Sequence, residues 1–181
     1  MINNDGLLTS AEVINSPFFN ERPEGTEISL LVIHCISLPE GQFGTVHVNH
    51  LFTGQLDCSA DPSFACLEGL EVSAHCVIRR DGHVEQYVPF NKRAWHAGVS
   101  CFDGVAGCND FSIGIELEGT DCTAYTNLQY QSLAQLTIQI QHKYPHITQQ
   151  RIVAHSEIAP GRKTDPGREF DWQYYFQLLD R

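Results

Sequence analysis

The chain has 181 residues, with 11 Lys or Arg against 22 Asp or Glu, so its formal net charge at pH 7 is −11. That length suits one core, and we expect residues 1–181 to form a single domain. The acidic balance argues against a nucleic-acid partner, and 42% hydrophobic with 18% charged residues is typical of a folded globule and not of a disordered chain.

The first half of the chain alternates apolar runs with loop-forming sequence. Residues 29–36 are apolar and β-branched, which predicts a strand buried on both faces, with His34 inside it. Residues 37–71 are rich in Gly, Pro, Asp and Asn and predict a long excursion with one short helix near residues 50–52. Residues 72–80 and 83–88 flank Asp81-Gly82, so we expect a β-hairpin there.

The second half adds strands and helices. Residues 111–118 alternate between apolar and polar side chains, as in a strand. Thr126 is a helix N-cap for an apolar stripe that Pro145 ends, residues 151–155 predict a short strand, and Asp171 caps a final helix. We therefore expect an α/β fold with a central mixed β-sheet flanked by helices.

Two histidines stand in or at the end of apolar strands. His34 and His155 each need a polar partner in such a place, and Asp165 follows in a loop stiffened by prolines. Two histidines and one aspartate would leave a fourth tetrahedral position open, the arrangement of a catalytic zinc. The alternative is that both histidines are core residues bonded to backbone carbonyls and that Asp165 only starts a turn.

A carboxylate inside an apolar strand is the second unusual feature. Glu116 is costly to bury unless a cation or hydrogen bonds compensate, and a desolvated glutamate suits a general base. Lys163 would project the same way as Asp165 if that stretch is extended, where its ammonium could stabilise an oxyanion. The alternatives are a wetted strand face for Glu116 and an ordinary surface position for Lys163.

The compartment follows from what the sequence lacks. No apolar run is long enough for a membrane span, and the amino terminus has neither the basic start nor the apolar segment of a secretory signal. The seven cysteines form an odd count without a Cys-x-x-Cys pair, which fits reduced thiols better than a disulfide framework. We expect a cytoplasmic protein without a membrane partner.

Five segments, in order along nearly the whole chain, resemble the zinc-dependent N-acetylmuramoyl-L-alanine amidases, a family that includes phage amidases and peptidoglycan recognition proteins. The likeness is closest to its cytosolic branch from Gram-negative bacteria, which acts on 1,6-anhydro-N-acetylmuramyl-L-alanine. The segments are residues 30–34, 72–82, 93–98, 108–121 and 155–167.

The resemblance implies the peptidoglycan-recognition fold and a role for each unusual residue. His34, His155 and Asp165 would bind Zn²⁺, Glu116 would act as acid and base, and Lys163 would hold the tetrahedral intermediate. The residues expected to contact the substrate are His75, Trp95, His96 and Arg162.

The implied reaction cleaves the amide between (anhydro)N-acetylmuramic acid and L-alanine of a small muropeptide. It belongs to peptidoglycan recycling, and in such a family it influences β-lactamase induction. We expect a monomer. Two alternatives remain: a peptidoglycan-binding module without catalysis, and a lytic amidase that acts on the intact cell wall.

Overall fold

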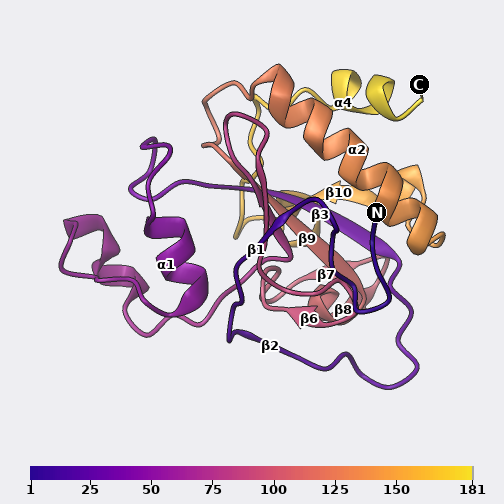
Figure 1. The fold of residues 1–181 in the computed structure, drawn as a ribbon, viewed down its shortest axis with the longest axis horizontal. Coiled ribbons are helices and arrows are strands. Elements are labelled where there is room, and N and C mark those ends of the chain that lie inside the picture. Colours follow the sequence, from indigo (N-terminus) through magenta and orange to yellow (C-terminus); the bar gives the residue numbers. More distant parts are fainter. Residues whose placement is uncertain (181) are drawn as a thin grey trace.

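The computed structural model describes residues 1–180, which form one domain around a six-stranded mixed sheet with the order β1-β5-β4-β9-β3-β10 (Figure 1). Strands β4, β9, β3 and β10 are parallel, and β5 joins β4 in the antiparallel hairpin. The strands are β1 (Glu12–Val13), β3 (Leu30–Ile36), β4 (Cys76–Ile78), β5 (Val84–Gln86), β9 (Ser112–Glu118) and β10 (Ile152–Ala154).

Smaller elements surround this sheet. Two short ribbons pair β2 (Phe19–Asn20) with β6 (Arg93–Ala94) and β7 (Cys101–Phe102) with β8 (Val105–Ala106). The helices are α1 (His47–Thr53), α2 (Asn127–Lys143), α3 (His155–Ile158) and α4 (Trp172–Leu179), with 3₁₀ turns at Pro62–Leu67, Cys108–Asp110 and Gln149–Arg151. The predicted α/β fold is confirmed.

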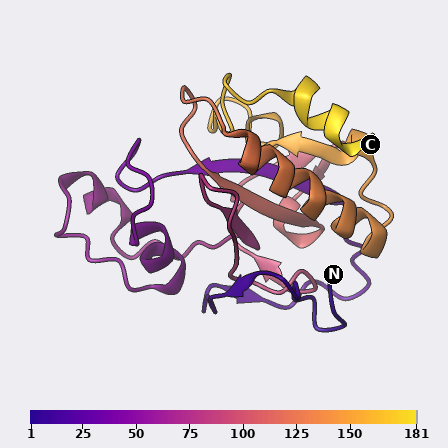
Figure 2. The same cartoon turned by 45° about the horizontal axis from the view of Figure 1, so that its top comes forward.

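The two faces of the sheet have different partners because alternate strand residues point to opposite sides. Helices α2 and α4 cover one face (Figures 1 and 2), and Leu31, Ile33 and Ile115 belong to the core beneath them. Leu30 and Val32 belong to a separate core on the other face, together with residues of the segment that precedes β9. The even-numbered residues of β3, His34 among them, therefore point away from α2 and α4.

Most predicted elements appear, with boundary shifts. The excursion contains α1, which is longer than expected, and the hairpin strands are shorter than the predicted 72–80 and 83–88. His155 does not end a strand as predicted: it is the first residue of α3, because Glu157 accepts a hydrogen bond from the Ala154 N–H (2.6 Å) and so caps a new helix. No helix of residues 1–180 has the length and apolar character of a membrane span.

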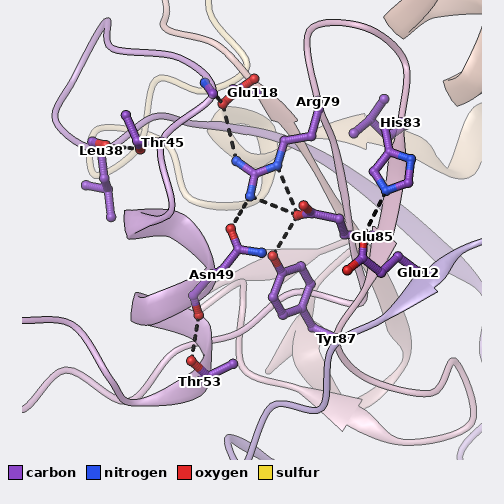
Figure 3. Close-up of polar contacts among 12 residues, drawn as sticks. Glu12, Leu38, Thr45, Asn49, Thr53, Arg79, His83, Glu85, Tyr87 and Glu118 are labelled. Carbon is purple, nitrogen blue, oxygen red and sulfur yellow. Dashed lines mark hydrogen bonds and ion pairs between the residues drawn. The ribbon is translucent and has the colours of Figure 1, made fainter.

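A buried ion-pair network fastens the excursion to the sheet (Figure 3). Arg79, which follows β4, pairs with Glu118 (3.2 Å) at the end of β9 and with Glu85 (2.9 Å) on β5, and it also contacts Asn49 on α1. Glu118 in turn accepts a hydrogen bond from the Gly44 N–H (2.6 Å) in the excursion. One guanidinium group thus holds together the hairpin, the central strand and α1.

Helix α2 begins with a complete capping box, which gives a testable contribution to stability. The Thr126 hydroxyl accepts from the Gln129 N–H (3.1 Å) and donates to the Arg80 carbonyl (2.7 Å). We expect Thr126→Ala to lower the free energy of unfolding by about 1–2 kcal/mol in urea denaturation. Thr148 precedes a 3₁₀ turn without such a bond, so Thr148→Ala should change it by less than about 0.5 kcal/mol. Equal losses in both variants would contradict this account.

Candidate metal centre and active site

Parallel pairing places three candidate residues in one row across β9, β3 and β10. Glu116 is the register partner of His34, and Ala154 pairs with Ile33, so His155 follows at the level of His34. In parallel strands, partners in register present their side chains to the same face. A sheet thus brings together residues that lie 82 and 121 positions from one another along the chain.

The two imidazoles and Asp165 converge on a single point. His34 Nδ1 lies 2.9 Å from His155 Nδ1, and each of these nitrogens lies 3.0 Å from Asp165 Oδ2. Both histidines are almost fully buried, and Asp165 is partly exposed. Among residues 1–180, these three residues have ligand atoms that could hold a metal ion, all within 4.8 Å of one another.

The donor set fits a divalent metal ion. Burial lowers the pKa of His34 to about 4, so its imidazole is neutral and can offer a lone pair. Burial alone would raise the pKa of Asp165, but its hydrogen bonds with His155 and His34 lower it well below the usual value, so it is ionised. Two histidines and one carboxylate form the ligand set of an open catalytic zinc site.

The loop that carries Asp165 is anchored to the rest of the domain. The Ser156 N–H donates to the Asp165 carbonyl (3.1 Å), and the Tyr125 hydroxyl donates to the Pro166 carbonyl (2.7 Å). Gly167 packs so closely on Asp121 that a Cβ atom would lie 2.2 Å from its Cα. The third candidate ligand is therefore placed by a loop held at three points.

Glu116 combines burial with an unsatisfied oxygen. Its side chain is 8% exposed, and Oε2 has no hydrogen-bond partner among the described residues. Burial, with the charge of Asp165 as a smaller cause, raises the pKa of Glu116 well above its usual range, and the Lys163 ammonium acts in the opposite direction. The structure thus rules out a wetted strand face for Glu116.

A cleft of about 520 Å³ opens beside the converging ligands. Its walls come from the end of β3, the excursion, the loop after β9 and the loop before Asp165, and they include Cys35, Leu38, Leu67, Asp121, Lys163 and Asp165. A larger cavity of about 650 Å³ lies between α1 and the hairpin. There, however, Arg79 is already paired with Glu85 and Glu118, so we place the chemistry in the smaller cleft.

Two residues expected to contact the substrate have other partners. His75 is fully buried, accepts a hydrogen bond from the Gly114 N–H (3.0 Å) and faces the Lys92 carbonyl (3.1 Å), and its substrate contact stays a prediction. His96 is also buried and lies behind His34, 2.9 Å from the ring nitrogen that faces away from Asp165. It is absent from the residues of the cleft wall and contacts His34 instead, and its substrate contact also stays a prediction.

The other two predicted substrate contacts stay predictions. Trp95 is half-buried, stacks on Phe18 and donates to Asn20 Oδ1 (3.2 Å), and it is absent from the cleft wall. Arg162 lies on that wall, although one of its nitrogens donates to the carbonyls of Ala97 (2.6 Å) and Val99 (2.8 Å).

One supporting residue was missed from the sequence. The Asn109 side-chain oxygen accepts hydrogen bonds from the N–H groups of His96 (3.1 Å) and Ala97 (2.8 Å). It thereby fixes the backbone beside the candidate metal ligands. An asparagine before a strand carries no signal of such a task, because loop asparagines usually serve their own turn.

Comparison with known proteins gives the family. A family model described as N-acetylmuramoyl-L-alanine amidase matches residues 24–168. The chain belongs to this family. It is 53% identical to the 1,6-anhydro-N-acetylmuramyl-L-alanine amidase AmpD of Citrobacter freundii over 99% of the chain and 95% of that protein. Its Escherichia coli K12 counterpart is 52% identical over 100% and 98%.

Solved structures agree with the fold. The crystal structure of an AmpD selenomethionine derivative superposes with a TM-score of 0.96, at 53% identity over 99% of both chains. The amidase AmiD of Escherichia coli has a TM-score of 0.62 at 31% identity, over 87% of this chain and 60% of that one. The predicted family and fold are confirmed, and the residue roles stay predictions.

The ligand geometry predicts one divalent ion per chain. We expect elemental analysis of the purified protein to find about one equivalent, and His155→Ala to weaken metal binding by at least about 10²-fold, because it removes a direct ligand. His146 pairs with Glu27 at the exposed surface, so His146→Ala should bind like the unchanged protein. Metal that persists in the His155 variant would contradict the assignment.

Proposed function

We propose that the chain is a zinc-dependent amidase that hydrolyses the amide bond between 1,6-anhydro-N-acetylmuramic acid and L-alanine of muropeptides in peptidoglycan recycling. Residues 1–181 would act as one catalytic domain. Family membership and relatives more than 50% identical over nearly their whole length support this activity. The observation that carries the mechanism is the row formed by Glu116, His34 and His155, with Asp165 closing the ligand set.

His34, His155 and Asp165 would hold the metal. When bound, Zn²⁺ supplies Lewis-acid chemistry: it polarises a carbonyl and makes water more acidic. Three protein ligands would leave one position free for water or substrate.

Glu116 would move the proton. Its carboxylate takes a proton from the water that attacks the amide carbon, and the carboxylic acid then gives that proton to the departing alanine nitrogen. The raised pKa suits both steps, because the group is a stronger base than an exposed glutamate and is still able to release its proton. Burial among apolar strands keeps other waters from that oxygen.

Lys163 would stabilise the charge that develops on the carbonyl oxygen. It lies on the cleft wall beside Asp165, and its charge acts on Glu116. An ammonium in that place favours the tetrahedral intermediate over the planar amide.

The substrate class is supported by a relative. AmiD has been solved with anhydro-N-acetylmuramic acid-L-Ala-D-gamma-Glu-L-Lys as its substrate. For this chain we propose a muropeptide of the same kind, a monomeric enzyme in the cytoplasm and, through removal of inducing muropeptides, an influence on β-lactamase induction.

The activity is tested by release of L-alanine peptides from anhydromuropeptide and from intact sacculi. We expect rapid release from the small substrate only, and a fall in kcat of about 10²–10⁴ in Glu116→Gln, which loses the proton acceptor but keeps the metal ligands. Release from sacculi at a similar rate would favour a lytic amidase. Full turnover by Glu116→Gln with metal bound would remove the proposed acid and base.

Lys163 has a separate signature in the pH profile. We expect Lys163→Met to lower kcat by about 10²–10³. Because its ammonium lowers the pKa of Glu116, its loss should also move the acid limb of kcat/KM to higher pH. Lys143→Met, on the exposed end of α2, is the matched control and should change neither. An acid limb that stays in place would show that Lys163 does not act on Glu116.

A further inference from the structure

The second ring nitrogen of His34 leads into a buried chain of polar groups. His34 Nε2 lies 2.9 Å from His96 Nδ1, and His96 Nε2 lies 3.1 Å from Ser112 Oγ. His34 and Ser112 have exposures of 1% and 0%, and His96 has 9%. These three residues therefore form one line of hydrogen bonds that runs from the metal centre into the protein.

The domain is shaped to hold His96 in this line. A Cβ atom on Gly114 would lie 2.4 Å from the ring of His96, so only glycine at this point of β9 leaves room for the imidazole. Asn109 fixes the backbone of His96 from the other side. The ring of His96 thus has one orientation, with Nδ1 toward His34 and Nε2 toward Ser112.

A neutral imidazole has one donor and one acceptor, which restricts how the line can be protonated. His155 Nε2 faces the Ala97 carbonyl (3.1 Å), so it carries the proton and leaves Nδ1 with a free lone pair. For His34 to bind a metal through Nδ1, its proton must sit on Nε2 and be donated to His96 Nδ1. His96 must then donate from Nε2 to Ser112 Oγ.

The opposite direction suits the protein when the metal has been removed. Two bare nitrogens and a carboxylate oxygen at 2.9–3.0 Å from one another would repel without a cation between them. A proton on His34 Nδ1 relieves this by donating to Asp165. His34 Nε2 then accepts from His96 Nδ1, and His96 Nε2 accepts from the Ser112 hydroxyl. Each ring keeps one proton, so no proton is gained or lost.

We propose that His34, His96 and Ser112 form a hydrogen-bond relay whose direction reverses when the metal binds, and that His96 is a positioning residue for metal binding. The inference rests on the metal site of the proposed function. Ser112 suits the end of the relay because a hydroxyl can either donate or accept. Partners behind a metal-bound histidine set its tautomer and typically change metal affinity about 10–100-fold when removed.

Imidazole ¹⁵N NMR of the full chain, metal-free and loaded with Zn²⁺, tests the reversal directly. We expect both His34 and His96 to carry the proton on Nδ1 without the metal and on Nε2 with it. His75 is the internal control: its Nδ1 accepts from the Gly114 N–H, so it should keep its proton on Nε2 in both samples. A single tautomer of His96 in both samples, with Zn²⁺ bound, would overturn the relay.

The positioning role is tested with two variants of nearly equal shape. In His96→Asn the amide oxygen can take the place of Nδ1 and accept from His34, whereas His96→Leu offers no acceptor. We expect the Zn²⁺ dissociation constant, measured by competition with a chelator, to rise about 10–100-fold in the Leu variant and less than about fivefold in the Asn variant.

The outcomes separate this inference from the proposed function. Equal affinities in the two variants would overturn the positioning role of His96 while leaving the amidase intact. Failure of the unchanged protein to bind Zn²⁺ would instead overturn the metal site itself. If the Leu variant does not fold, the NMR comparison on the unchanged chain still decides whether the relay reverses, and an Asn variant that binds Zn²⁺ more than about tenfold more weakly than the unchanged protein would overturn the proposed acceptor at this position.

Discussion

Parallel strand register is the constraint on which the site depends. The pairing of β3 with β9 sets Glu116 beside His34, and the pairing of β3 with β10 brings His155 to the same level. A slip of one residue would turn each of these side chains to the face that α2 and α4 cover. The apolar residues next to them along the strands, such as Ile33 and Ile115, pack in the core and so hold this register. They therefore help to place the candidate site as well as to form the core.

Polar groups gathered in this row cost free energy that the surrounding core must offset. His34, His155 and Glu116 are buried among strands. Burial lowers the pKa of His34 and raises the pKa of Glu116, so it favours the neutral form of both groups. Shifted pKa values of this kind are common at functional sites. Most ring nitrogens of the buried histidines have hydrogen-bond partners, which limits the cost in free energy. One oxygen of Glu116 has no partner among the described residues and is available for a proton.

Local sequence signals predicted the elements that local physics determines. Asp81-Gly82 located the hairpin, Thr126 and Pro145 bounded α2, and the run around His34 located the central strand. The two-residue strands such as β1 and β2 were missed because they are defined by pairing with distant partners and carry no periodicity of their own.

The same distinction between local and long-range determinants applies to the residues of the candidate site. Misplaced polar residues in apolar strands marked His34 and Glu116, since such residues are unfavourable without a task. The burial of His75 and the place of His96 behind His34 depend on tertiary packing around Gly114, which spacing along the chain does not encode.

Anomalous X-ray diffraction at the zinc absorption edge, on crystals loaded with Zn²⁺, would locate the ion relative to the three candidate ligands. We expect a single strong peak bonded to Nδ1 of His34, Nδ1 of His155 and a carboxylate oxygen of Asp165, at about 2.0–2.2 Å from each. A peak held by other residues, or no peak beside the row of Glu116, His34 and His155, would contradict this expectation.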